Sequence, residues 1–178
     1  MGIRIKEKTF EIRLNSKEIK TRINQLGEQI TRDYIGKDLV VLGVLNGAFI
    51  FLADLCRSID LPLSCSFIKL SSYQGTESTG EVRSIIGLDQ ELKGKNIIIV
   101  EDIIDSGLSM DYLLKTLSDY HPEQIAIATL LFKPDAFRYN YQIDYVGFEI
   151  PNKFVIGYGL DYEGLGRNLP DIYQLSTL

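Results

Sequence analysis

Residues Ile97–Met110 read IIIVEDIIDSGLSM, and this stretch decides the fold that the sequence predicts. Its first four residues are wholly apolar, which is typical of a strand buried on both faces of a parallel sheet. A polar turn containing Gly107 follows, and the apolar positions of Met110–Tyr120 then recur with helical spacing. A strand, a turn and a helix in this order indicate an α/β fold.

The same alternation extends outward in both directions along the 178 residues. Helices are predicted at residues 16–34, with Ser16 as the cap, and at 48–58 and 110–120. Strands are predicted at Thr9–Leu14, Asp38–Leu45, Ser64–Leu70, Arg83–Gly87, Asn96–Val100, Gln124–Phe132 and Tyr145–Phe148. We therefore expect a mainly parallel twisted sheet flanked by helices, with ligands at the carboxyl ends of its strands.

The chain length fits a single domain spanning residues 1–178. We expect its core at about residues 36–148. Residues 151–178 read as irregular. Residues 149–178, together with residues 1–14, are predicted to form a small hood lobe over the edge of the sheet.

Composition narrows the class of protein. The formal net charge is −5 and the pI about 5.0, which argues against a broad nucleic-acid surface. No apolar run approaches the roughly 18 residues that a membrane span needs, and the first 14 residues lack the apolar core of a signal peptide. A cytoplasmic protein is expected. Cys56 and Cys65 are predicted to be buried free thiols rather than zinc ligands, and His121 to be a surface residue in a turn.

The turn after the apolar strand combines two chemistries. Glu101, Asp102 and Asp105 offer carboxylates, which suit vicinal hydroxyls, a metal or a proton. Ser106–Ser109 lead into a helix, whose amino end binds phosphate well. A sugar phosphate satisfies both halves. The alternative is an acidic turn in which Asp105 or Ser109 caps the helix.

This pattern of apolar strand, two acids, two apolar residues, Asp, Ser, Gly, any residue and Ser resembles the phosphoribosyl diphosphate (PRPP) signature of type I phosphoribosyltransferases. Other segments resemble the hypoxanthine-guanine branch of that family, and the likeness covers residues 38–173. They are the diphosphate loop Leu45–Ala48, the mobile catalytic loop Ser71–Val82, the Lys133 segment LLFKPD and the C-terminal segment Val146–Pro170. The resemblance implies the type I phosphoribosyltransferase fold.

The resemblance also implies roles in binding PRPP. Glu101 and Asp102 are expected on the ribose hydroxyls, and Asp105 is expected to accept a proton from the attacking base. The 5′-phosphate is expected in a cradle formed by Asp105, Ser106, Gly107, Leu108 and Ser109. The remaining PRPP contacts are expected from Asn46, Gly47, Ser72, Tyr73 and Arg167.

One departure concerns Asn46, because the family usually has Lys or Arg there. Backbone N–H groups of the loop remain available to the diphosphate, and Arg167 is expected to replace some of the missing charge.

For the base, the resemblance implies that Lys133 donates to the 6-oxo group of the purine, which would reject adenine. Phe154 is expected to stack on the base, and Val155 and Asp161 to offer backbone carbonyls to its 2-position. Considered alone, Lys133 at a strand end more often contacts solvent, and a lone Phe154 more often packs in a core.

The implied reaction belongs to purine salvage. The 5-phosphoribosyl group of PRPP passes to hypoxanthine or guanine, giving IMP or GMP and diphosphate. Mg²⁺ is the implied metal, held mainly by PRPP with help from Glu101, Asp102 and Asp161. The implied assembly is a homodimer or homotetramer. Two alternatives stay open: an enzyme of the same fold for another base such as xanthine, and a nucleotide-sensing regulator that binds RNA.

Overall fold

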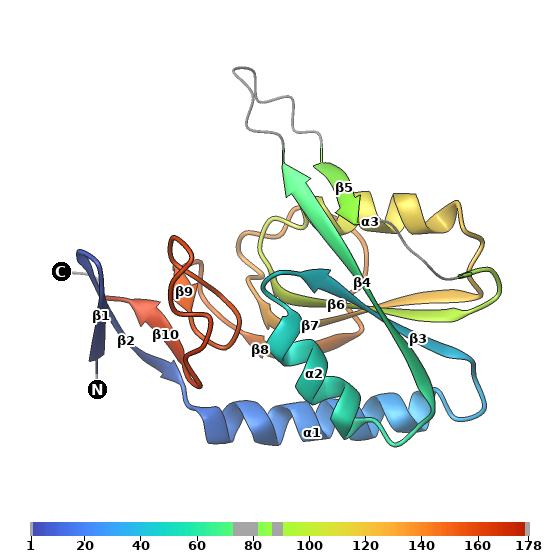
Figure 1. The fold of residues 1–178 in the computed structure, drawn as a ribbon, viewed down its shortest axis with the longest axis horizontal. Helices are drawn as coiled ribbons and strands as arrows, with labels where there is room; N and C mark the ends of the chain where they lie inside the picture. The colour runs from blue at the N-terminus through green and yellow to red at the C-terminus, as the bar shows by residue number, and fades with distance from the viewer. Residues whose placement is uncertain (1, 73–81, 87–90, 177–178) are drawn as a thin grey trace.

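The computed structural model describes residues 2–72, 82–86 and 91–176, and the larger of its two sheets carries most of the chain (Figure 1). Its strands are β3 (Leu39–Leu45), β4 (Leu63–Ser72), β5 (Val82–Ile86), β6 (Asn96–Ile104), β7 (Gln124–Phe132) and β8 (Tyr145–Glu149). They lie in the order β5-β4-β3-β6-β7-β8. All neighbours are parallel except β5, which runs antiparallel to β4. The predicted α/β fold with a mainly parallel sheet is confirmed.

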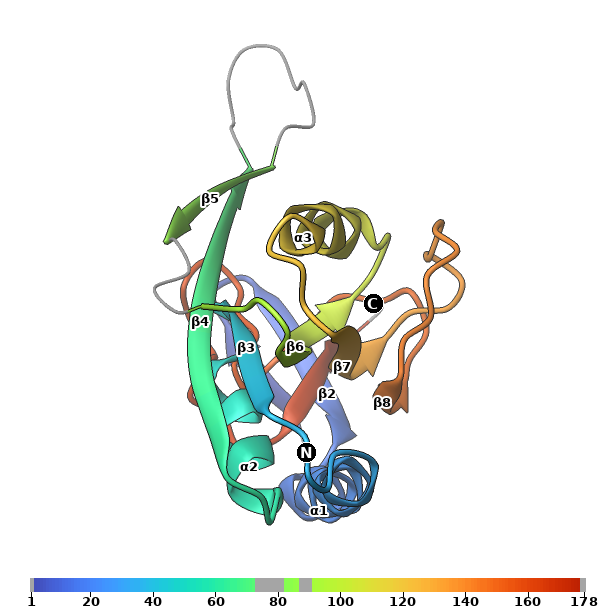
Figure 2. The same ribbon diagram turned by 90° about the vertical axis from the view of Figure 1, so that its right-hand side faces the viewer.

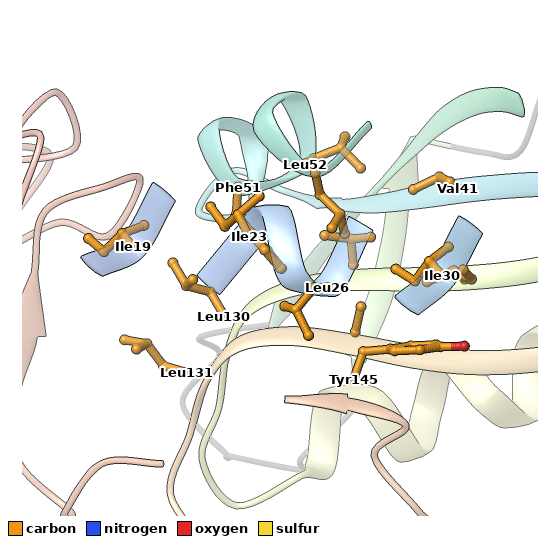
Figure 3. Close-up of a cluster of buried hydrophobic side chains, with 14 of the residues drawn as sticks. Ile19, Ile23, Leu26, Ile30, Val41, Phe51, Leu52, Leu130, Leu131 and Tyr145 are labelled. Atoms are coloured by element: carbon orange, nitrogen blue, oxygen red, sulfur yellow. The ribbon is translucent and has the colours of Figure 1, made fainter. Parts of the chain in front are cut away.

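Helices cover both faces of this sheet (Figure 2). The helices α1 (Ser16–Asp33) and α2 (Phe49–Ser58) pack on one face, and α3 (Leu108–Ser118) packs on the other. The α1 and α2 side chains meet the sheet in one buried cluster (Figure 3), which includes Ile19, Ile23, Leu26, Ile30, Phe51, Leu52, Leu130 and Tyr145. Apolar burial on both faces explains why β3, and β6 from Ile97 to Val100, are unbroken apolar runs.

The start of α1 corrects one prediction. Asn15, and not Ser16, is the cap: its side chain accepts from the Glu18 N–H at 3.0 Å, and the Glu18 carboxylate accepts from the Asn15 N–H. This reciprocal pair is a capping box, which satisfies two backbone donors at once. Ser16 is already helical, and its N–H donates to Asp171 at 2.7 Å.

The second sheet joins segments from opposite ends of the chain. Its strands are β1 (Gly2–Ile5), β2 (Lys8–Leu14), β9 (Val155–Ile156) and β10 (Ile172–Leu175), in the order β1-β2-β10-β9. All its pairings are antiparallel, and Leu14 lies opposite Ile172. The expectation that residues 151–178 are irregular was therefore wrong, because β9 and β10 are short strands made by pairing with distant segments. A small core of Phe10, Ile156 and Tyr173 holds this sheet together.

Of the two thiols, Cys56 on α2 is partly buried and Cys65 on β4 is exposed. The prediction of a buried thiol was wrong for Cys65, because part of this face of β4 stays open to solvent. Phe67, two residues further along the same face, is exposed as well. His121 is exposed in a turn, as predicted. In the described part of the chain, no helix is long and apolar enough to cross a membrane.

Candidate active site

The acid pair lies inside a strand rather than after one. β6 continues to Ile104, because Glu101 pairs with Thr129 and Ile104 with Phe132 of β7. The expectation that this strand ends before Glu101 was therefore wrong. The strand holds the backbone of Glu101 and Asp102 fixed at the carboxyl end of the sheet, and both side chains are half-buried.

Electrostatics set these two residues apart from surface acids. Burial, and then the charge of Asp102, hold the pKa of Glu101 well above its usual range. Burial also raises the pKa of Asp102, although the nearby Arg167 opposes that shift. Hydroxyl donors or a cation bound beside these two carboxylates would stabilise their charged forms.

The loop between β3 and α2 packs directly on the acid pair. A Cβ on Gly47 would lie 1.5 Å from Oδ2 of Asp102, so only glycine allows this approach. Asn46, beside it, is exposed, and the Leu45–Asn46 peptide bond is cis. The loop that the resemblance leads us to expect on the diphosphate therefore lies against Asp102, one of the two acids expected on the ribose.

The turn from β6 into α3 forms a cavity of about 170 Å³. Gly107 is the N-cap residue, and no side chain caps the helix, so neither Asp105 nor Ser109 has the capping role considered above. The first turn of a helix leaves its N–H groups without intrahelical partners. The cavity is lined by Glu101, Ile103, Ile104, Asp105, Ser106, Gly107, Leu108, Ser109 and Met110. Backbone donors and two serine hydroxyls thus surround a space large enough for a phosphate group.

A second cavity of about 200 Å³ adjoins the first, since Ile103 and Asp105 line both. Its other lining residues are Asp102, Lys133, Phe154, Val155, Leu160 and Asp161. Lys133 is only 7% exposed, and its Nζ lies 2.7 Å from Oδ2 of Asp105. Lys133 therefore does not contact solvent at the end of the strand. It is a buried cation that forms an ion pair with Asp105, the residue predicted to accept the proton.

Phe154 lies at the open side of this second cavity and is 44% exposed. Its ring is tilted against Phe10 at 6.4 Å and meets Tyr162 edge-on at 5.9 Å between centroids. An aromatic face left half open beside a cavity suits stacking on a planar ring better than core packing.

The C-terminal segment contributes an ion pair, Asp161–Arg167, to the site. Asp161 and Arg167 form an ion pair at 2.5 Å, and Arg167 also donates to the Gly159 carbonyl at 2.6 Å. The second oxygen of Asp161 accepts from the Gly164 N–H at 2.7 Å. Arg167 is thereby fixed near Asp102.

The predicted site residues therefore converge at one end of the sheet, with one exception. Tyr73 and most of the predicted catalytic loop lie outside the described residues, and Ser72 is the last residue of β4. Sequence reasoning missed four residues that line the cavities: Ile103, Ile104, Met110 and Leu160. Continuing the strand alternation through the acid pair would have indicated Ile103. No pattern marked Leu160. The described residues hold no group of three or more His, Cys, Asp or Glu suited to a metal.

Comparison with known proteins agrees with this geometry. The family model described as the phosphoribosyl transferase domain matches residues 13–163. The hypoxanthine-guanine phosphoribosyltransferase of Mycobacterium tuberculosis (strain H37Rv) is 43% identical over 90% of this chain and 87% of its own. The hypoxanthine phosphoribosyltransferase of Escherichia coli (strain K12) is 43% identical over 96% of this chain and 97% of its own. The crystal structure of a hypoxanthine phosphoribosyltransferase from Staphylococcus aureus matches with a TM-score of 0.88 at 42% identity, covering 93% of this chain and 91% of that one.

The α/β sheet, with an acid pair beside a turn that can hold a phosphate, and the matching family model define the class of the protein. It is an enzyme that transfers a phosphoribosyl group. At this identity and coverage, the chain belongs to the hypoxanthine-guanine phosphoribosyltransferase family.

Proposed function

We propose that this enzyme transfers the 5-phosphoribosyl group of PRPP to hypoxanthine, guanine or both, giving IMP or GMP and diphosphate. The observation that carries the proposal is the ion pair between buried Lys133 and half-exposed Asp105 in the cavity beside Phe154. This pair places a cationic donor and a proton acceptor side by side, within reach of a planar ligand on Phe154.

The PRPP half of the site is built around β6. In the proposal, Glu101 and Asp102 accept from the ribose hydroxyls, and the 5′-phosphate lies in the cavity of residues 105–109. The diphosphate lies between the loop at Asn46 and Gly47 and the guanidinium of Arg167. Support for this comes from the contact of Gly47 with Asp102 and the fixed position of Arg167. Ser72 and Tyr73 belong to the same proposed PRPP site.

The base half lies in the second cavity. Lys133 donates to the 6-oxo group of the purine, and Phe154 stacks on its ring. The backbone carbonyls of Val155 and Asp161 face the 2-position. Adenine presents a donor where Lys133 also donates, so both groups would lose their hydrogen bonds on burial.

In the reaction, a nitrogen of the purine ring attacks C1 of the ribose. The C1–N bond forms as the bond from C1 to the diphosphate oxygen breaks, and the proton of the attacking nitrogen passes to Asp105. Positive charge develops on the ribose, and the carboxylates of Glu101 and Asp102 favour it. Lys133 contacts both the 6-oxo group and Asp105, because an ammonium group has three donors.

Mg²⁺ fits the residues present. Glu101 and Asp102 are adjacent half-buried carboxylates whose pKa values are raised, and hard oxygen ligands are those that Mg²⁺ prefers. Both oxygens of Asp161 already accept from Arg167 or Gly164, so Asp161 fits a role through water. When bound with PRPP, Mg²⁺ neutralises charge on the leaving diphosphate.

We further propose that residues 36–148 form the core of one domain, with residues 1–14 and 149–178 as its hood. A cytoplasmic enzyme that assembles as a homodimer or homotetramer completes the proposal. The family resemblance supports this part, and sedimentation velocity with cell fractionation tests it.

Turnover of five bases tests the proposed function. The purified protein is incubated with PRPP, Mg²⁺ and hypoxanthine, guanine, xanthine, adenine or uracil. We expect turnover of hypoxanthine or guanine, and adenine turnover at least about 100-fold slower, because the buried donors would be left unpaired. Adenine turnover within about tenfold of hypoxanthine would contradict the base assignment. Fast turnover of xanthine alone, or RNA retained on a filter without any turnover, would favour one of the two alternatives.

A variant pair links that selectivity to the buried cation. Lys133→Met keeps the length of the side chain and removes its charge, so we expect hypoxanthine turnover to fall and the preference over adenine to shrink. Lys115→Met is the matched control, because Lys115 is exposed on α3 and, among the residues that the structure describes, pairs only with Asp111 four residues earlier. Loss of selectivity in both variants would point away from Lys133.

A further inference from the structure

The turn Gly157–Leu160 connects two halves of the proposed base site. Val155 precedes it, Asp161 follows it, and Leu160 lines the cavity itself. Its backbone is unusual, because Gly157, Tyr158 and Gly159 have successive φ values of 98°, 50° and 104°. A tyrosine rarely adopts this left-handed conformation, so the surrounding structure must hold it there.

Backbone contacts hold this turn on three sides. The Tyr158 N–H donates to the Leu169 carbonyl at 2.8 Å, and the Gly159 N–H donates to the Arg167 carbonyl at 2.9 Å. A Cβ on Gly159 would lie 2.1 Å from the carbonyl oxygen of Gly47, so the turn lies directly on the loop between β3 and α2. The turn therefore touches the proposed diphosphate loop while it carries the proposed base contacts.

One side chain ties the turn to a helix. The Tyr158 hydroxyl donates to Oδ2 of Asp54 on α2, and the other oxygen of Asp54 pairs with Arg57. Tyr158 is only 8% exposed. Since α2 begins just after the Asn46–Gly47 loop, this hydrogen bond and the Gly159–Gly47 contact join the same two segments.

We propose that Tyr158 is a positioning residue for the base: its hydrogen bond to Asp54 fixes the Gly157–Leu160 turn on α2 and thereby sets where Val155 and Asp161 meet the purine. Tyr158 does not line the base cavity, so it acts through the turn. The proposal rests on the base assignment made under the proposed function.

A second tyrosine provides a matched control. Tyr145 on β8 is 5% exposed, and its hydroxyl donates to Asp33 of α1 at 2.8 Å. Burial raises the pKa of both phenols far above the usual range, so both stay protonated and donate. Both are buried tyrosine–carboxylate pairs between a helix and another segment, but Tyr145 lies outside both cavities of the site.

The experiment compares Tyr158→Phe with Tyr145→Phe. Because a small misplacement of substrate-positioning groups has a large kinetic effect, we expect Tyr158→Phe to raise KM for hypoxanthine at least about fivefold, with the Kd of PRPP within about twofold of wild type. Tyr145→Phe should lower Tm comparably and leave KM unchanged. Asp54→Ala should reproduce the Tyr158→Phe result, whereas Asp54→Asn should stay near wild type, because its amide oxygen still accepts the hydroxyl proton.

The double variant Tyr158→Phe/Asp54→Ala should have a KM for hypoxanthine no higher than that of either single variant.

Hydrogen exchange of the Tyr158 and Gly159 amides gives a readout without substrates. Exchange should speed up in Tyr158→Phe and Asp54→Ala, and not in Tyr145→Phe. If KM and amide exchange stay at wild-type values in both variants, the proposal is overturned. If the wild type turns over no purine, the proposed function fails and the link between Tyr158 and the base is refuted. Faster amide exchange in the variants would then still show that the Tyr158–Asp54 hydrogen bond holds the turn. Asp54→Ala carries the test should Tyr158→Phe fail to fold.

Discussion

The Asp105 side chain already forms an ion pair within the protein. It is half exposed, yet one oxygen is already taken by the buried ammonium of Lys133 at 2.7 Å. It does not cap α3, whose N-cap is Gly107. Asp105 therefore has no structural duty at the helix, and its partner is the residue proposed to read the base.

Replacing Asp105 by Asn separates proton transfer from binding. The amide keeps the shape of the side chain and an oxygen for Lys133, but it cannot accept the proton. We expect kcat to fall about 10²–10⁴-fold, the usual range for a general base, with little change in the PRPP dissociation constant measured by titration. A variant that retains more than about a tenth of the wild-type kcat would show that Asp105 is not the proton acceptor.

Glu101→Gln should stabilise the free enzyme while it weakens PRPP binding. In the wild type, the folded-state pKa of Glu101 is raised above its unfolded value, so the folded state holds this proton more tightly. Stability therefore falls as the pH rises from the unfolded pKa through the folded one. Glutamine removes that dependence, so the variant should gain in Tm relative to wild type as the pH increases.

The measurement is Tm from pH 4 to pH 8 without ligands. Since about 1 kcal/mol shifts Tm by roughly 2–4 °C in a chain of this size, we expect a difference of a few degrees at about pH 8. Glu123→Gln, at an exposed position before β7, is the control that should show no such trend. A difference that shrinks as pH rises would contradict the electrostatic account of the acid pair.

At the scale of elements, the turn between β3 and α2 depends on the absence of one side chain. A methyl group at Gly47 would overlap Asp102, so Gly47→Ala must displace either the loop or the acid. We expect PRPP affinity to fall at least about tenfold, by analogy with other displaced positioning groups. Isothermal titration with PRPP and Mg²⁺ measures it.

Gly43→Ala is the control for this change. It lies four residues earlier in β3, and its Cβ would meet the flexible Leu52 side chain in the core instead. We expect it to lower stability by about 1–3 kcal/mol through overpacking, with PRPP affinity unchanged. Equal affinities in the two variants would mean that the Gly47–Asp102 contact does not shape the site.

The elements also show where sequence patterns suffice. The apolar run Gln124–Phe132 predicted β7 with its observed bounds, because burial on both faces leaves a local signature. The end of β6 was wrong because polar residues interrupt the run, while pairing with β7 carries the strand onward. β9 and β10 were missed for the same reason: a strand of two or four residues is defined by its partner. The Asp105–Lys133 pair joins positions 28 residues apart, so resemblance suggested both residues, and only the fold revealed their contact.

At the scale of the whole molecule, the base site depends on both ends of the described chain. Phe10 on β2 is fully buried and supports Phe154 and Tyr162, with centroids 6.4 and 6.2 Å away. Phe10→Leu removes aromatic contacts worth about 0.5–1.5 kcal/mol each. We expect a several-fold weaker affinity for hypoxanthine and unchanged PRPP binding. Phe51→Leu, in the core under the larger sheet, should reduce stability without separating the two affinities.

The pairing of β2 with β10 also sets an order of events on the ribosome. Every strand of the larger sheet precedes residue 150, so a nascent chain can fold the part of the PRPP site around β6 while synthesis continues and before Arg167 is made. β2 is made early, yet its inner partner β10 emerges only when Ile172–Leu175 are translated. Because such long-range pairing is slow to form, we expect stalled chains that lack β10 to resist proteolysis across residues 39–72 and 91–149 and to be cut within residues 2–14. Translation thus makes the acid pair and the 5′-phosphate turn first and completes the purine pocket last.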